Sequence, residues 1–268
     1  MATRVAIVGA TGKLGGIIRS VVEADPEFEI HALLSSRDQL ESIAGADLVA
    51  DASTPAVSID VVRAATENGV KLLVGTSGWS AERIALVRPL VEAAGTGAVF
   101  IPNFSVGSVV ASSLAAGAAG MFEAAEIVET HRETKSDSPS GTAVRTAEMI
   151  AAAHDGPVPA PFADQRARGQ QVAGVPVHSL RRPGVVARQE VVLSRPGESV
   201  TILHETVDPV LAYSPGIRVA LRAARDARGV HVGLEQFLDL GFVRGDVDGS
   251  APVREDAAPG QVARATGA

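Results

Sequence analysis

Cysteine is absent from this 268-residue chain, aromatic residues are scarce, and long apolar runs are missing. Without cysteine, disulfides, thiolate metal sites and a cysteine nucleophile are all excluded. Because aromatic residues make up only 3% of the sequence, we expect a core of Val, Leu, Ile and Ala, which suits buried parallel strands. The Ala-rich run at 111–121 is too short to span a bilayer, so no membrane contact is expected.

Acidic residues also outnumber basic ones, so the formal net charge is −7. A nucleic-acid partner would need a positive surface field, so this balance argues against one. No basic segment precedes the apolar residues 5–8, so no secretory signal is expected and the predicted location is the cytoplasm. Neither metal-ligand spacing nor a Gly-x-Ser-x-Gly elbow occurs, so we predict no metal site and no hydrolase.

The first hundred residues alternate between strand and helix patterns. Strand patterns lie at 5–8, 29–34, 47–51, 72–75 and 98–101, and helical patterns at 14–23, 57–68 and 81–94. Repeated βα units of this length predict an α/β fold with a Rossmann-like, doubly wound parallel sheet. In such sheets the ligand binds beyond the carboxyl ends of the strands, so the turns there are candidate contacts.

The pattern changes after about residue 105. Helical patterns now lie at 108–122 and from 141, and strand patterns lie at 125–130, 175–180, 186–193 and 199–205. They predict a second, α+β domain with a mixed or antiparallel sheet. We therefore expect a dinucleotide-binding domain at 1–105 plus 216–240 and a substrate-binding and oligomerisation domain at 106–215. The Gly-, Ala- and Pro-rich tail at 245–268 is expected to be disordered.

A glycine-rich turn follows the first predicted strand and opens a helix. Its spacing, G-x-x-G-x-x-G from Gly9 to Gly15, is a variant of the dinucleotide fingerprint. Gly9 would make the tight turn, Gly12 would let the backbone approach a pyrophosphate, and Gly15 would let the helix pack closely. The predicted cofactor contacts are Gly9, Ala10, Thr11, Gly12, Lys13 and Leu14. The alternative is a tight βα turn without a ligand, with Lys13 in solvent.

Three other turns are candidate cofactor contacts. After the second strand, Ser35, Ser36 and Arg37 stand where an acidic residue would bind a ribose 2′-hydroxyl. Hydroxyls and a guanidinium suit a 2′-phosphate, so NADPH is favoured over NADH, unless Arg37 is an ordinary surface residue. The remaining candidates, expected near the nicotinamide, are Gly75, Thr76, Ser77, Pro102, Asn103 and Phe104. Asn103 and Phe104 would also act as a hinge, and the alternative for them is a plain interdomain linker. The alternative for Thr76 and Ser77 is a capped helix start.

A polar stretch at 131–142 is expected to bind an anion and to move a proton. Ser140 is a predicted helix N-cap, and the backbone N–H groups of Gly141 and Thr142 with the Thr142 hydroxyl would form an anion site. His131 and Lys135 are the two groups here that can donate a proton. The alternative is a solvated loop followed by an ordinary helix start.

These motifs together resemble the 4-hydroxy-tetrahydrodipicolinate reductase (dihydrodipicolinate reductase) family. Residues 129–143 are similar to its pattern E-x-H-H-x-x-K-x-D-A-P-S-G-T-A, and the resemblance extends to 9–15, 74–79, 101–107, 174–179 and 188–191. It implies NAD(P)H-dependent reduction of a small cyclic dicarboxylate, dehydrated 4-hydroxy-tetrahydrodipicolinate, to tetrahydrodipicolinate in the diaminopimelate and lysine pathway. It also implies proton transfer by His131 and Lys135, carboxylate binding at 140–142, and a homotetramer formed through the second-domain sheets.

The sequence departs from the family pattern at three positions. Arg132 stands where the family has a second histidine that contacts substrate, Ser138 where it usually has Ala, and Ala52 where it usually has Phe. Arginine keeps a hydrogen-bond donor and adds a permanent charge, so we assign Arg132 to a substrate carboxylate. Two alternatives therefore stay open: an NADPH-dependent reductase of another imine or keto acid, and a non-catalytic NADPH-binding sensor.

Overall fold

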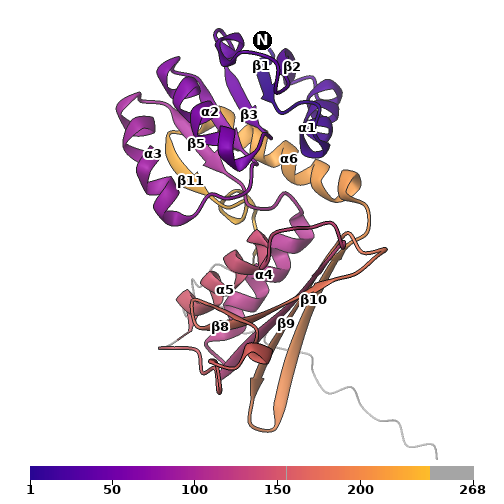
Figure 1. The fold of residues 1–268 in the computed structure, drawn as a ribbon. Coiled ribbons are helices and arrows are strands. Elements are labelled where there is room, and N and C mark those ends of the chain that lie inside the picture. Colours follow the sequence, from indigo (N-terminus) through magenta and orange to yellow (C-terminus); the bar gives the residue numbers. More distant parts are fainter. Residues whose placement is uncertain (155, 242–268) are drawn as a thin grey trace, which may run out of the picture.

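The computed structural model describes residues 1–154 and 156–241, and Figure 1 shows two parts joined through several segments. The predicted disordered tail at 245–268 lies outside the described residues. The first part contains a six-stranded parallel sheet in the order β11-β5-β4-β3-β1-β2. Its strands are β1 (Thr3–Val8), β2 (Phe28–Leu34), β3 (Leu48–Asp51), β4 (Lys71–Val74), β5 (Gly97–Phe100) and β11 (Gly229–Val232). This sheet confirms the predicted Rossmann-like fold.

Helices cover both faces of the first sheet because its strands carry apolar side chains on both sides. Val5 and Ile7 of β1 pack with α1 (Lys13–Ala24) and α6 (Pro209–Asp226). The alternate residues of β1, Ala6 and Val8, pack on the opposite face with α2 (Pro55–Glu67) and α3 (Ala81–Ala93).

The chain returns to the first sheet through α6 and β11. Helix α6 begins at Pro209, where Asp208 accepts hydrogen bonds from two backbone N–H groups. It therefore starts before residue 216, where we expected the chain to return to the first domain. Proline is tolerated at the first helical position, so Pro209 starts the helix instead of breaking it. The sequence pattern did not predict β11, which is short and only partly buried at the edge of the sheet.

The second part contains a five-stranded sheet in the order β10-β9-β6-β8-β7. Its strands are β6 (Ala124–His131), β7 (Gln170–Val172), β8 (Val175–Arg181), β9 (Ala187–Arg195) and β10 (Glu198–Thr206). Strands β6 and β8 are parallel and the other pairs antiparallel, so the sheet is mixed. Helices α4 (Val106–Ala119) and α5 (Gly141–Ala153) pack together on one face, as Figure 1 shows. Strand β7 was not predicted from the sequence.

None of the helices in the described part of the chain is both long and apolar enough to cross a bilayer.

Candidate active site

A cleft of about 250 Å³ is lined by residues of both parts of the molecule. The first part contributes segments that follow β1, β4 and β5, and the second part contributes the polar segment between β6 and α5. The predicted site residues that line this cleft are Leu14, Gly75, Ser77, Pro102, Asn103, Phe104, His131, Arg132, Lys135, Ser140, Gly141 and Thr142. Groups assigned from separate motifs therefore face one space.

The turn after β1 allows the close backbone approach that a dinucleotide needs. Gly9 has a φ of +82°, and a Cβ at this position would lie 2.4 Å from the carbonyl oxygen of Ala52, just after β3. A Cβ at Gly15 would lie 2.2 Å from the carbonyl oxygen of Gly9. Both positions therefore require glycine, and they hold the first turn of α1 beside β1 and β3, where the strand order reverses.

The N-terminus of α1 has the properties of an anion site. Gly12 is the N-cap residue, and no side chain of the described residues caps this helix. The first turn holds no acidic residue. The N–H groups of Lys13 and Leu14 start the helix, where backbone donors lack intrahelical partners and the dipole is positive.

The turn after β2 carries both cationic and acidic groups. The Ser35 backbone N–H and hydroxyl both donate to one carboxylate oxygen of Asp38, at 2.7 Å each. These hydrogen bonds lower the pKa of Asp38. The side chains of Ser36 and Arg37 are exposed on this turn. The Ser35 hydroxyl, predicted as a cofactor contact, is thus hydrogen-bonded to Asp38. The sequence analysis did not predict this hydrogen bond.

Thr76 lies in the predicted nicotinamide turn but points its hydroxyl at the protein. Its side chain is buried and donates to the backbone carbonyl of Asp51 at 3.4 Å. Its neighbours Gly75 and Ser77 line the cleft.

His131 is held by a buried carboxylate that the sequence analysis did not assign. Its Nδ1 lies 2.5 Å from Glu129, whose side chain is fully buried, and Arg181 donates to both oxygens of that carboxylate at 3.1 Å. Burial alone would raise the pKa of Glu129, but hydrogen bonds from His131, Ser179 and Arg181 outweigh it and lower the pKa to about 2. Glu129 is therefore ionised at neutral pH and accepts at Nδ1, which leaves Nε2 of His131 as the ring nitrogen available to a ligand.

The loop that carries Lys135 is fixed by the same arginine. Arg181 donates through Nε to the backbone oxygen of Lys135 at 3.2 Å and through its terminal nitrogen to that of Asp137 at 2.7 Å. The Lys135 Nζ donates to both carboxylate oxygens of Asp137 at 2.8 Å. Burial would raise the pKa of Asp137, but Lys135 lowers it. One guanidinium thus anchors the segments that carry both predicted proton donors.

Arg132 lines the cleft, as does Tyr213 of α6. Arg132 Nε donates to the Thr134 hydroxyl at 3.2 Å. Burial raises the pKa of Tyr213, and the positive charge of Arg132 partly offsets this rise. A guanidinium from the second part and a phenol on α6 therefore lie close enough to influence each other electrostatically.

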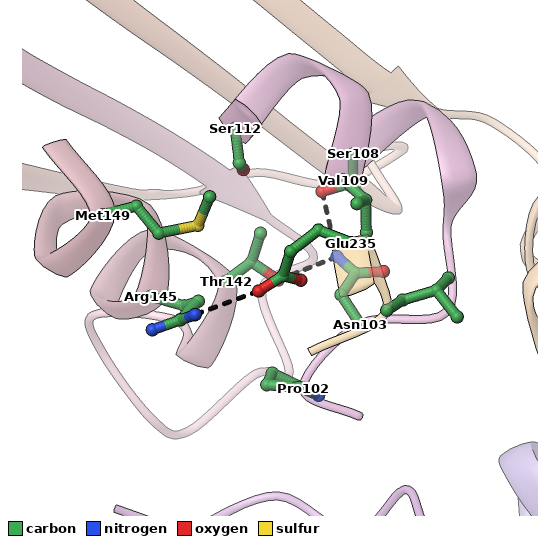
Figure 2. Close-up of a pocket in the computed structure, with 10 residues that line it drawn as sticks. Pro102, Asn103, Ser108, Val109, Ser112, Thr142, Arg145, Met149 and Glu235 are labelled. Carbon is green, nitrogen blue, oxygen red and sulfur yellow. Dashed lines mark hydrogen bonds and ion pairs between the residues drawn. The ribbon is translucent and has the colours of Figure 1, made fainter. Parts of the chain in front are cut away.

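The start of α5 and the segment after β5 meet at the side of the cleft. Ser140 is the N-cap residue of α5 and accepts a hydrogen bond from the Ala143 backbone N–H at 3.2 Å. The Thr142 hydroxyl accepts from the Asn103 side chain at 2.9 Å, as Figure 2 shows. Asn103, predicted as a cofactor contact and hinge residue, thus touches the predicted substrate side.

Several residues of the site were missed by the sequence analysis. Glu129 and Arg181 hold His131 and the Lys135 loop in place. The cleft itself is also lined by the unassigned residues Ser108, Asp137, Val186, Ala187, Arg188, Gln189, His204, Thr206 and Tyr213. The Nε2 of His204 lies 3.2 Å from the Ser105 hydroxyl, and burial lowers the pKa of His204, an effect partly offset by the charge of Glu205. Arg181 could have been found only from the β6–β8 register, which pairs it with His131.

The described residues contain no group of three or more His, Asp or Glu side chains suited to a metal ion.

Comparison with known proteins identifies the family. The model for the N-terminus of dihydrodipicolinate reductase matches residues 3–104, and the model for its C-terminus matches residues 107–238. A 4-hydroxy-tetrahydrodipicolinate reductase of Clavibacter michiganensis subsp. michiganensis is 52% identical over 279 residues, covering 100% of both chains. The enzyme of that name from Streptomyces coelicolor is 41% identical and covers 88% of this chain and 98% of its own.

A solved structure shows the same architecture. Dipicolinate-bound dihydrodipicolinate reductase from Paenisporosarcina sp. TG-14 is 27% identical, with a TM-score of 0.72 over 89% of this chain and 100% of that chain. The match spans both sheets, and the family models cover both parts of the fold. The predicted resemblance is confirmed, and this chain belongs to the dihydrodipicolinate reductase family of oxidoreductases.

Proposed function

We propose that this chain reduces dehydrated 4-hydroxy-tetrahydrodipicolinate to tetrahydrodipicolinate with a nicotinamide cofactor, as part of diaminopimelate and lysine synthesis. The observation that carries this proposal is the shared cleft, which brings the segment after the glycine turn together with His131, Lys135 and the start of α5. The curated relatives bear the corresponding enzyme name.

The residues present fit a dinucleotide. The positions of Gly9 and Gly15 leave no room for a Cβ, and the N-terminus of α1 offers free backbone donors to a pyrophosphate. Gly9, Ala10, Thr11, Gly12, Lys13 and Leu14 would hold the pyrophosphate, and Gly75, Ser77, Pro102 and Phe104 would lie by the nicotinamide. When bound, the reduced cofactor supplies the hydride that goes to C4 of the substrate ring.

NADPH is the proposed preference. Ser36 and Arg37 are exposed on the turn after β2, where Arg37 would pair with a 2′-phosphate. Asp38 stands on the same turn and would favour a ribose hydroxyl, so we expect NADH to be used as well.

The second part would bind a small dicarboxylate. The N–H groups of Gly141 and Thr142 at the start of α5 and the guanidinium of Arg132 supply donors for its carboxylates. The relative from Paenisporosarcina sp. TG-14 holds dipicolinate, a planar molecule of this class.

The proton would reach the ring carbon next to C4 from the His131 and Lys135 pair. Glu129 fixes His131 through Nδ1, so Nε2 is the atom that can donate towards the cleft. Lys135 lies on the same wall, and its ammonium donates hydrogen bonds to both carboxylate oxygens of Asp137. The Arg181 contacts keep both groups in fixed positions before the substrate binds.

Two further properties are proposed. Leu180 and Leu203 are 46% and 51% exposed on the face of the second sheet opposite α4 and α5, which supports burial between copies in a homotetramer. The absence of a membrane-spanning helix among the described residues is compatible with the cytoplasm as the location.

The test is an assay of the purified chain with NADPH and the product of dihydrodipicolinate synthase, followed at the nicotinamide absorbance band. We expect rapid oxidation of NADPH that depends on both components. Absence of oxidation above background would contradict the proposed substrate. Arg132 stands where the family has a histidine that contacts substrate, so the substrate could differ. The same assay on a panel of cyclic imines and keto acids tests whether the chain reduces one of these instead. NADPH binding without any turnover would favour the sensor.

A further inference from the structure

We propose that Asn103 and Glu235 are positioning residues that tie the nucleotide-binding sheet to the first turns of α5. The inference rests on the proposed function, because the N-terminus of α5 is the proposed substrate carboxylate site. Neither side chain would donate a proton or hydride; both would set where that site stands relative to the nicotinamide.

The first tie is the hydrogen bond from Asn103 to Thr142, and both side-chain N–H donors of Asn103 are hydrogen-bonded within the protein. Its side-chain nitrogen donates to the Ser108 hydroxyl at 3.0 Å and to the Thr142 hydroxyl at 2.9 Å, as Figure 2 shows. Its side-chain oxygen accepts from the Ser105 backbone N–H at 2.8 Å. A primary amide has two N–H donors, so none is left for a nicotinamide carboxamide. The Thr142 oxygen accepts here, which leaves its hydrogen free for a substrate carboxylate.

The second tie is an ion pair one helical turn further along α5. Arg145 donates to Glu235 at 2.9 Å, and their side chains are 38% and 21% exposed (Figure 2). Gly233 has a φ of +96°, and a Cβ there would lie 2.1 Å from the Glu235 carboxylate, so the carboxylate folds against this glycine. The glycine therefore makes room for the acid to meet Arg145.

The two ties connect the same two elements: one face of α5 and the ends of two neighbouring strands of the first sheet. Thr142 and Arg145 are three residues apart, so they lie on one face of α5. Their partners follow neighbouring strands of the first sheet, because Phe100 of β5 pairs with Val232 of β11 and each partner lies three residues beyond. The carboxyl ends of two adjacent strands thus hold one helix face at two points.

The space between the ties is small, and its lining combines apolar side chains with a few polar groups. A cavity of about 30 Å³ lies there, lined in part by Ser108, Ser112 and Met149, and it is large enough for a single water molecule. The buried Nε of Arg145 has no hydrogen-bond partner among the described residues. Helix α5 cannot move away from the first sheet without breaking both ties, so the ties couple substrate position to cofactor position.

The experiment compares Asn103→Ala, Glu235→Gln and the double variant with the wild type. Glu23→Gln is the matched control, because it breaks an Arg–Glu pair on the exposed surface of α1. We expect each single variant to lose about tenfold in kcat/KM for the substrate, because misplacement of reacting groups slows transfer. The deuterium isotope effect with NADPH labelled at the transferred position should rise, and NADPH affinity should stay within about twofold.

A second measurement does not depend on turnover. Calorimetric titration with dipicolinate, with and without NADPH, gives the coupling between the two halves of the cleft. We expect the wild type and Glu23→Gln to bind dipicolinate more tightly when NADPH is present, and both tie variants to lose this gain. The double charge exchange Arg145→Glu with Glu235→Arg should restore part of it.

Several outcomes would overturn the proposal. They are tie variants that match Glu23→Gln in both experiments, a wild type without coupling, or an Asn103→Ala variant whose whole loss is in NADPH affinity. A wild type that shows coupling but no turnover would contradict the proposed function alone, since the coupling would still support the ties.

Discussion

The turn after β1 and the loop after β6 serve the same cleft, but they are built in different ways. The turn would contact its ligand through backbone groups, and its shape depends on a few residues close in sequence. Gly9 and Gly15 are needed because neighbouring carbonyl groups leave no room for a side chain. The loop consists of side chains held by a distant strand, since Arg181 of β8 anchors Glu129, Lys135 and Asp137. A site made of backbone is visible in a short motif, whereas a site made of side chains depends on strand register.

If this comparison is right, changes in the loop should affect catalysis and changes in the turn should affect cofactor binding and folding. The largest expected effect is on Lys135. Lys135→Ala should lower kcat by roughly 100- to 10,000-fold, because it removes a proposed proton donor. NADPH affinity, measured by fluorescence titration, should change little. Equal losses in kcat and affinity would remove the distinction between the two regions.

A change in the glycine turn should act in the opposite way. Gly15→Ala would place a Cβ 2.2 Å from the Gly9 carbonyl oxygen, so α1 must shift. We expect a loss of about 3 kcal/mol in the free energy of unfolding, together with weaker NADPH binding. Gly16→Ala is the control, because a Cβ at Gly16 meets nothing within 4 Å among the described residues. Chemical denaturation of both variants would show no difference if the close approach were unimportant.

The anchoring role of Arg181 predicts a large effect from a residue that the sequence motif does not contain. Arg181→Met should reduce kcat by about 50- to 100-fold while NADPH binding is retained, because both proton donors lose their fixed position. Arg182→Met, at the exposed neighbouring position, should retain wild-type kinetics. Steady-state kinetics that are the same for the two variants would show that Arg181 does not position the loop.

The buried carboxylate of Glu129 should make stability depend on pH. Its pKa is about 2 in the folded chain against 4.5 ordinarily, so its stabilising contribution is complete above pH 4.5 and is lost as pH falls towards 2. Glu129→Gln should therefore be roughly 2 kcal/mol less stable than the wild type at pH 7, with the difference shrinking below pH 4.5. Urea unfolding at several pH values checks this. A difference that stays constant with pH would contradict it.

The smallest expected effect is on the turn after β2, where we propose that the 2′ group of the cofactor binds. Arg37→Ala should weaken NADPH binding by roughly three- to tenfold and leave NADH binding unchanged, because an exposed ion pair contributes little. Asp38→Ala should instead weaken NADH binding and favour NADPH. Ratios of kcat/KM for the two cofactors give the answer, and an unchanged ratio in both variants would place the 2′ contact elsewhere.

Much of the fold could be predicted from the sequence because its signals are local. The strands around 5–8 and 98–101 are apolar runs bounded by turns, and the glycine spacing marks the first helix. Strands β7 and β11 could not be predicted, because three or four residues at a sheet edge carry no clear periodicity. The start of α6 at Pro209 was also not predicted, although proline is compatible with the first position of a helix.

The candidate site divides in the same way. His131, Lys135 and the start of α5 were predicted because they lie within one short motif. Arg181 and Glu235 were not, because they reach the site only through the β6–β8 register and through the return of the chain along β11. Asn103 was noticed as a hinge residue, but its side-chain partners belong to helices that the sequence could not orient.

The most direct test of the central claim follows the hydride itself. The purified chain would be given NADPH deuterated at the transferred position of the nicotinamide, with dehydrated 4-hydroxy-tetrahydrodipicolinate, and the product examined by NMR. We predict one deuterium at C4 of tetrahydrodipicolinate, with the new proton on the neighbouring carbon coming from solvent through the enzyme. A product without deuterium, or with the label at another carbon, would contradict the proposed reduction.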